Sequence, residues 1–156
     1  MRRGQAIVET LIAILAIMLV FFGAYHLSRV IAARTLLDHA AARAARAKAV
    51  GFNDWMCEKS ARVAMIPVAG KRLWPEEGGF EELGRIPIYL SSEDQARANG
   101  ILEYDLWHAT DVYVDSGMGI SPRAEAAVHL DSAEYEVTGR AEIESHFPLY
   151  MYDSGR

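Results

Sequence analysis

The hydrophobic positions of the chain begin with one long apolar segment near the N-terminus. From Thr10 through Ser28, nineteen consecutive residues contain no Asp, Glu, Lys or Arg, and most of them are Leu, Ile, Val, Ala, Met or Phe. A helix needs about 20 apolar residues to span the hydrocarbon core of a bilayer. The pattern therefore predicts a transmembrane helix.

The helix is expected to continue beyond the apolar segment. Residues 24–50 contain neither Pro nor Gly and are rich in Ala, Leu and Arg, which are good helix formers. At 1.5 Å per residue, a helix over residues 5–50 would be about 70 Å long. Apolar positions recur along its second half at helical spacing: Leu27, Val30, Ile31, Leu37, Ala41, Ala44 and Ala45.

This apolar stripe has two interpretations. Ala40 and Ala44 are small residues four apart, as are Ala41 and Ala45, and such pairs let another element approach a helix closely. The stripe packs either on the chain's own C-terminal domain or against other helices in an assembly, and both can hold along different lengths.

Residues 51–156 show shorter patterns. We expect an amphipathic helix within residues 52–66, with Trp55, Val63 and Ile66 facing inward, after a joint at Gly51 and Asn53. Residues 67–87 are rich in Pro and Gly and predict loops. The spacing from Ser92 to Gln95 is typical of a capping box, which predicts a helix that ends near Asn99.

The rest of the chain predicts strands, at residues 101–107, 110–114, 126–130 and 134–147. The last has the clearest alternation, with one apolar and one polar face. Its apolar face holds Tyr135, Val137, Ala141 and Ile143, and its polar face holds Glu134, Glu136, Thr138, Arg140, Glu142 and Glu144. The fold class is therefore α+β: a long N-terminal transmembrane helix, then a small antiparallel β-sheet domain packed on it.

The sign of the net charge changes near residue 50, where the long helix is expected to end. Residues 1–50 contain seven Lys or Arg against two acidic residues, whereas residues 51–156 contain nine against nineteen. So acidic a C-terminal part would repel phosphate backbones, which argues against a nucleic-acid partner.

Candidate catalytic and metal-binding residues form no convincing set. The five histidines show no ligand-like spacing: His26, His39, His108, His129 and His146. The segment from Asp111 to Gly117 lacks the carboxylate pattern of a calcium loop and is better explained as a turn, and Gly117-Met118-Gly119 lacks the lysine of a phosphate loop. Cys57, the single cysteine, is expected to be a small buried apolar residue. We therefore expect no cofactor, no metal and no enzymatic activity.

The residues before the apolar segment distinguish between kinds of membrane segment. A cleaved secretory signal would have a shorter apolar region and a small-residue cleavage site, but Tyr25-His26-Leu27-Ser28 follows here. A plain signal anchor leaves Gly4 and Glu9 unexplained. A short basic leader that ends in Gly4, followed by Gln5 and by Glu9 at the fifth place after the cut, resembles the precursors of type IV pilins.

The closer resemblance is to the TadE-like family, pseudopilin-type subunits of the tight-adherence (Tad) branch of type IV pili. It rests on the sequence GQAIVE at residues 4–9, on the Gly-initiated, Ala/Arg-rich stretch of residues 23–47 and on Val50-Gly51-Phe52. It covers about the first 55 residues of the chain.

This resemblance implies the organisation and role of the chain. Residues 1–4 would be a prepilin leader that a prepilin peptidase removes after Gly4, residues 5–50 the transmembrane and extended helix, and residues 51–156 an exported acidic α+β domain. The new α-amine on Gln5 would pair with Glu9 of a neighbouring subunit. Implied partners are other pilin and TadE-like subunits, the inner-membrane pilus platform and membrane lipid, in an oligomeric assembly.

The orientation implied by the resemblance conflicts with a charge count. A leader that meets a cytoplasmic peptidase places the N-terminus in the cytoplasm of a bacterium and the C-terminal domain in the periplasm or in an extracellular pilus. Five basic residues follow the apolar segment against two before it, and the positive-inside rule alone would favour the opposite orientation.

Three functions stay open at this level. The first is a minor pilin or pseudopilin in a Tad-type pilus, which the C-terminal domain of about 100 residues favours, because major Tad pilins are usually much shorter. The second is a main filament-forming subunit. The third is a membrane-anchored binding module with an acidic extracytoplasmic domain; an anchored enzyme ranks below these, because no nucleophile, base and pocket signature was found.

Overall fold

The long N-terminal helix predicted from the sequence is present in the computed structural model, which describes residues 2–75, 81–117, 123–131 and 136–144. Helix α1 runs without interruption over Arg2–Val50. It ends at Gly51, whose φ of 99° is a left-handed conformation that glycine adopts easily. The backbone amide of Gly51 donates to the carbonyl of Lys48, and that of Phe52 donates to the carbonyl of Ala47, which is a Schellman cap.

The chain divides into two compact units, and the boundary falls within α1. The first unit is Met1–Ala32 and the second is Ala33–Arg156. The last 18 residues of α1 therefore belong to the same unit as the C-terminal elements.

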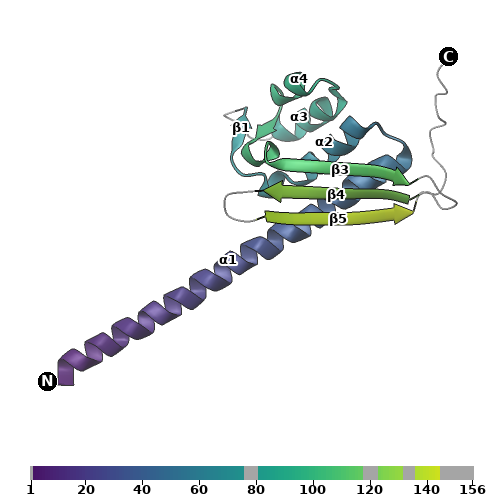
Figure 1. Ribbon diagram of the computed structural model, residues 1–156. Helices are drawn as coiled ribbons and strands as arrows, with labels where there is room; N and C mark the ends of the chain where they lie inside the picture. Colours follow the sequence, from purple (N-terminus) through teal and green to yellow (C-terminus); the bar gives the residue numbers. More distant parts are fainter. Residues whose placement is uncertain (1, 76–80, 118–122, 132–135, 145–156) are drawn as a thin grey trace, which may run out of the picture. The chain divides into compact units, whose positions relative to one another are not determined.

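Three antiparallel strands form the main sheet of the second unit, in the order β3-β4-β5 (Figure 1). Strand β3 is Thr110–Gly117, β4 is Arg123–Asp131 and β5 is Glu136–Glu144. Along β4 and β5, residues on one face are buried or half-buried and those on the other are mostly exposed, so the sheet has one core face and one solvent face. This confirms the predicted alternation of the last strand; Glu134, Tyr135 and residues 145–147 lie outside the described residues.

The core face of the sheet packs on the C-terminal part of α1. The side of α1 that faces the core of this unit is lined by fully buried residues, all small except Leu37: Ala33, Leu37, Ala40, Ala41, Ala44 and Ala45. Gly139 of β5 lies directly against the backbone of Leu37 and Asp38, and a Cβ at this position would collide with it. The backbone amide of Arg140 donates to Oδ1 of Asp38 at 3.1 Å. The apolar stripe thus packs on the chain's own domain from Ala33 onward, whereas Leu27 and Ile31 stay exposed.

The remaining elements form a smaller group built around aromatic residues. They are α2 (Asp54–Ala64), the 3₁₀ helix Ile66–Val68, β1 (Arg72–Trp74), α3 (Glu81–Ser91), α4 (Gln95–Asn99), β2 (Glu103–Tyr104) and the 3₁₀ helix Asp105–Trp107. Strands β1 and β2 pair as a two-stranded sheet. The buried cluster contains Ala69, Tyr89, Ala98, Leu102, Tyr104 and Trp107, and Val63 and Ile66 pack against it as expected.

Four local predictions were wrong. Residues 67–87 are not all loop, because β1 and the first part of α3 lie there, and α3 forms in spite of Pro87 because Tyr89 is buried in the aromatic cluster. The cap of α4 is Asp94, whose carboxylate accepts from the amide of Ala96, and not Ser92. Residues 101–107 form a two-residue strand and a 3₁₀ helix. Asp111–Gly117 belongs to β3 and is not a turn, because its residues pair in register with β4.

The close approach at Gly139 gives a testable prediction for stability. Gly139→Ala should destabilise the protein by about 3 kcal/mol, because the methyl group must displace the backbone of α1 or of β5. For a chain of this size the melting temperature should fall by roughly 10 °C. Thermal unfolding of the full chain in detergent, followed by near-UV circular dichroism, measures it.

Gly84→Ala is the matched control, because a Cβ at Gly84 meets nothing within 4 Å and alanine favours the helix. Equal melting temperatures for Gly139→Ala and the wild type would contradict the close packing of β5 on α1.

Candidate functional site

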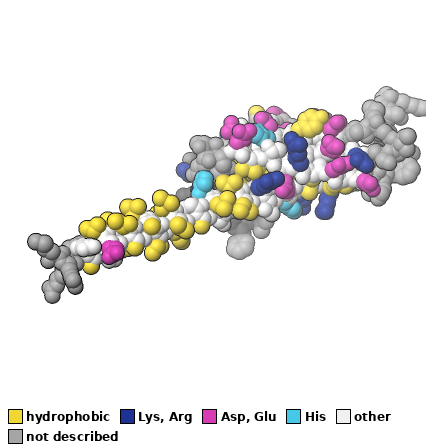
Figure 2. Space-filling view, turned by 60° about the horizontal axis from the view of Figure 1, so that its bottom comes forward, with side chains coloured by type: hydrophobic (Ala, Val, Ile, Leu, Met, Phe, Trp, Pro, Cys, Tyr) yellow, Lys and Arg dark blue, Asp and Glu magenta, His cyan; other side chains and the backbone are white. Residues whose placement is uncertain are grey.

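The N-terminal unit presents its apolar side chains to the outside. From Ile7 to Phe22 the large apolar side chains are between 53% and 69% exposed, and one helix is long and apolar enough to cross a membrane. In Figure 2 they cover this unit, with an acidic side chain among them near its start. An exposed apolar surface of this size requires lipid or other protein to cover it.

The predicted assembly residues lie at the beginning of this surface. Gln5 and Glu9 are both exposed and four residues apart in α1, so they lie on one face of the helix, one turn from each other. Gly4 precedes them within α1. Next to Glu9, Thr10 donates a hydrogen bond to the carbonyl oxygen of Ala6 at 2.8 Å, which satisfies its hydroxyl within the helix. Glu9 is thus the exposed carboxylate of a surface that is otherwise apolar.

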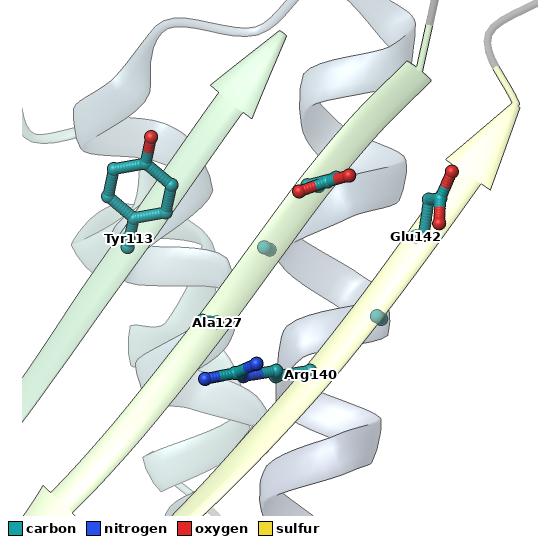
Figure 3. Close-up of a pocket in the computed structure, with 7 residues that line it drawn as sticks. Tyr113, Ala127, Arg140 and Glu142 are labelled. Carbon is teal, nitrogen blue, oxygen red and sulfur yellow. The ribbon is translucent and has the colours of Figure 1, made fainter. Parts of the chain in front are cut away.

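A second candidate lies on the solvent face of the main sheet. A shallow hollow of about 530 Å³ lies over the middle of the three strands. Its lining includes Tyr113, Glu125, Ala127, Arg140 and Glu142. Cross-strand register places Tyr113, Ala127 and Arg140 in one row, and Figure 3 shows the Arg140 side chain reaching from β5 over β4.

The charges around this hollow are mostly acidic. Asp115, Glu125 and Glu142 form the next row across the three strands, so three carboxylates lie side by side. Glu142 pairs with Arg123, at 2.7 Å between a carboxylate oxygen and a guanidinium nitrogen. Tyr113 is 63% exposed and lies about halfway along β3, an outer strand of the described sheet. An exposed aromatic ring beside carboxylates is a surface that suits a cationic side chain.

The sequence analysis did not identify this hollow. The alternation that predicted the polar face of β5 is also present in β3, where Asp111, Tyr113 and Asp115 point to the solvent side. The predicted strand at residues 110–114 included Tyr113, but the sequence did not give the register that places Tyr113 in one row with Arg140.

A buried lysine was also missed. Lys59 of α2 is only 1% exposed, and its ammonium group donates to the carbonyl oxygen of Ser92. The same nitrogen lies 5.3 Å from the ring centre of Trp55 and 5.2 Å from that of Tyr89. Burial lowers the pKa of Lys59, and the nearby Arg62 lowers it further. These contacts join α2 to α3 and to the segment after it, which is a structural role.

Cys57 is buried, as the sequence predicted. None of its surface is exposed, and its thiol donates to the carbonyl oxygen of Phe52 with 3.6 Å between sulfur and oxygen. Burial raises the pKa of the Cys57 thiol to about 11 from 9.0, while Lys48 acts in the opposite direction. A thiol is a poor nucleophile under these conditions, because only the thiolate reacts.

Two of the histidines contact other polar side chains of the second unit. Nε2 of His108 lies 2.8 Å from a carboxylate oxygen of Glu103. Nδ1 of His129 lies 2.8 Å from the hydroxyl of Thr138. Among the residues that the structure describes, no three His, Cys, Asp or Glu side chains are grouped so that they could hold a metal ion; His146 lies outside them.

These observations define a chain with one membrane-compatible N-terminal helix that continues into an α+β unit. The family model described as TadE-like protein matches residues 4–46, which include Gly4, Gln5 and Glu9. This part of the chain is thus similar to TadE-like proteins, as its motif indicated. Comparisons with the curated proteins and with the solved structures found no match.

The burial of Cys57 gives a second prediction. At pH 8, a maleimide should modify Cys57 in the native protein about 100-fold more slowly than an unfolded cysteine of ordinary pKa, from the loss of thiolate alone. Because the native state holds the thiol proton more tightly, this group's stabilisation is complete below pH 9 and disappears as the pH rises toward 11.

Mass spectrometry of the labelled chain over time measures the rate. A Cys57→Ala, Glu93→Cys double variant is the control and should react rapidly, because residue 93 is exposed. Equal rates for native and denatured Cys57 would contradict the burial of the thiol.

Proposed function

We propose that this protein is a minor pilin or pseudopilin that takes part in the assembly of a Tad-type type IV pilus. In this proposal a prepilin peptidase removes residues 1–4, and Gln5 becomes the first residue of the mature chain. The observation that carries the proposal is the TadE-like match over residues 4–46, in which Glu9 follows the cut by five places at the head of an exposed apolar helix.

The exposed apolar surface of α1 is compatible with two environments, one after the other. In the inner membrane, lipid covers the side chains between Ile7 and Phe22. During assembly, helices of other subunits replace the lipid with little change in hydrophobic free energy, because hydrocarbon and apolar side chains are similar solvents. Because this exchange changes the hydrophobic free energy so little, it does not select a neighbour. Assembly at the inner-membrane platform therefore needs a further interaction that determines which subunits pair and in which register.

The pair formed by Glu9 and the new amine provides this interaction. A carboxylate near hydrocarbon is unfavourable without a partner, by a few kcal/mol at the bilayer centre and less near the interface. The α-amine that cleavage creates on Gln5 of a neighbouring subunit is positively charged, and the pair is strong where water is scarce. A neighbour displaced along the helix leaves both charges without a partner, so the correct register is selected.

The second unit argues for a minor subunit over a main filament-forming one. It contains a complete sheet with its own buried core, and its exported, acidic solvent face would have to be accommodated at every repeat of a filament. In our proposal the N-terminus is cytoplasmic and the sheet domain is periplasmic or lies in an extracellular pilus.

One observation favours a second candidate function, a membrane-anchored binding module. The hollow with the exposed Tyr113 lies on the solvent face of the sheet and is suited to a charged partner. The two functions are compatible, but a module that only binds would need neither cleavage after Gly4 nor Glu9.

The role of Glu9 gives a third prediction. Glu9→Gln and Glu9→Ala should reduce incorporation into sheared pili or into the isolated assembly complex tenfold or more, which corresponds to a loss of at least about 1.4 kcal/mol. Membrane insertion and removal of residues 1–4 should be retained. Quantitative immunoblots of the pilus and membrane fractions measure both.

Thr10→Ala is the matched control, because Thr10 neighbours Glu9 but its hydroxyl bonds only within the helix. It should incorporate normally. Wild-type incorporation of both Glu9 variants would overturn the assembly role of this residue.

A further inference from the structure

Two faces of the second unit carry opposite charge. The solvent face of the main sheet contains seven exposed acidic side chains and two exposed basic ones. The acidic residues are Asp111, Asp115, Glu125, Asp131, Glu136, Glu142 and Glu144, and the basic ones are Arg123 and Arg140. Of these, Arg123 is already paired with Glu142. The face is therefore strongly acidic, with the ring of Tyr113 exposed within it.

The opposite face of the same unit is formed by the side of α1 that points away from the sheet. His39, Arg43 and Arg46 are exposed and follow one another at intervals of four and three residues, so they lie on one face of the helix. The sheet covers the other side of α1, where Leu37, Ala41 and Ala44 are fully buried. Within the described residues, no carboxylate pairs with the guanidinium group of Arg43 or Arg46.

We propose that the sheet face of one copy of this chain docks on the exposed Arg43 and Arg46 face of α1 in a second copy. This rests on the proposed function, because it assumes copies concentrated in one membrane or one assembly. The two complementary faces lie on opposite sides of one unit, so the contact is head-to-tail. Two or a few copies are enough for such a contact, whereas a two-fold dimer would require one self-complementary face.

The dimensions of the two faces agree. Three strands are roughly 14 Å wide, which accommodates one helix of about 10 Å diameter. An arginine from the neighbour would reach the hollow over Ala127, where the ring of Tyr113 offers a stacking surface. Glu125 lines that hollow and Asp115 lies opposite it on β3, so their carboxylates would accept the hydrogen bonds of the arginine. Arg140 lies across the same hollow and has to move toward one of these carboxylates to admit the neighbour.

The contact is small, which decides where it can operate. A face of this width and about 25 Å in length buries roughly 350 Å² per partner, less than half of the about 800 Å² of a standard stable interface. It is therefore weak in dilute solution and depends on the high effective concentration of chains held side by side. Anionic lipid headgroups and nucleic acids are poor occupants of the sheet face, because like charges repel.

Cysteine cross-linking in membranes tests this contact with the full chain. In a Cys57→Ala background, one tagged copy carries Ala127→Cys on the sheet and a second, differently tagged copy carries His39→Cys on α1. We expect a mixed disulfide whose yield is at least tenfold above that of the pair Ala127→Cys with Arg97→Cys, since Arg97 is exposed on α4, outside both faces. The yield should also fall in 1 M salt, because exposed charges are then screened within about 3 Å.

Charge reversal supplies the decisive control. Asp115→Lys with Glu125→Lys should lower the yield at least tenfold, as should Arg43→Glu with Arg46→Glu, and a mixture of the two double variants on the appropriate copies should restore most of it. Glu93→Lys, an exposed acid outside the sheet, should have no effect. Unchanged melting temperatures show that the variants fold.

Each outcome bears on one proposal only. No cross-link in chains that are cut after Gly4 and incorporated would overturn the self-docking and leave the proposed function intact. A charge-dependent cross-link in chains that are never cut would leave the docking and overturn the function. Loss of incorporation in the Asp115→Lys, Glu125→Lys variant with no cross-link in the wild type would show that a different protein occupies the sheet face, which also overturns self-docking.

Discussion

The second unit depends on the contact between Gly139 of β5 and the backbone of Leu37 and Asp38 in α1. A side chain at this position would separate the strand from the helix, and the alanines that line the helix could then no longer fill the space beneath the sheet. Asp38 strengthens the same contact by accepting the backbone hydrogen bond of Arg140, whose strand β5 is at the edge of the sheet that the structure describes. Small residues on both elements thus let β5 approach α1 closely, while α2 packs against β3.

One continuous helix serves two environments, and its sequence changes accordingly. Up to about residue 32 the side chains are large, apolar and exposed, which suits lipid or neighbouring helices. From Ala33 onward, small buried residues face the sheet and arginines occupy the exposed side. Helix α1 therefore has an apolar surface in its first part, which lipid or protein must cover, and a polar exposed surface in its second part, which can face water. A long apolar helix whose second half also supports a folded domain requires this change.

The periodic patterns in the sequence predicted the elements they determine directly. The long helix was predicted from its uninterrupted apolar segment and its helix-forming composition, whereas α2 and the alternation in β5 were predicted because each buries a face with a clear period. The helix α3 was not foreseen, because Gly84 and Pro87 are breakers by local propensity and only the burial of Tyr89 against Trp107 makes the helix favourable. The candidate residues Gly4, Gln5 and Glu9 came from a local motif, whereas the hollow at Tyr113 and Arg140 depends on the register of three strands, which no local pattern reveals.

The functional account depends on a cut that creates one positive charge at the head of an apolar helix. Without it, Glu9 has no amine to pair with and the exposed surface of α1 is only an anchor. The most direct measurement is the N-terminal sequence of the protein purified from the cells that naturally produce it. The account predicts that the mature chain begins at Gln5; a chain that retains Met1 and residues 2–4 would contradict it.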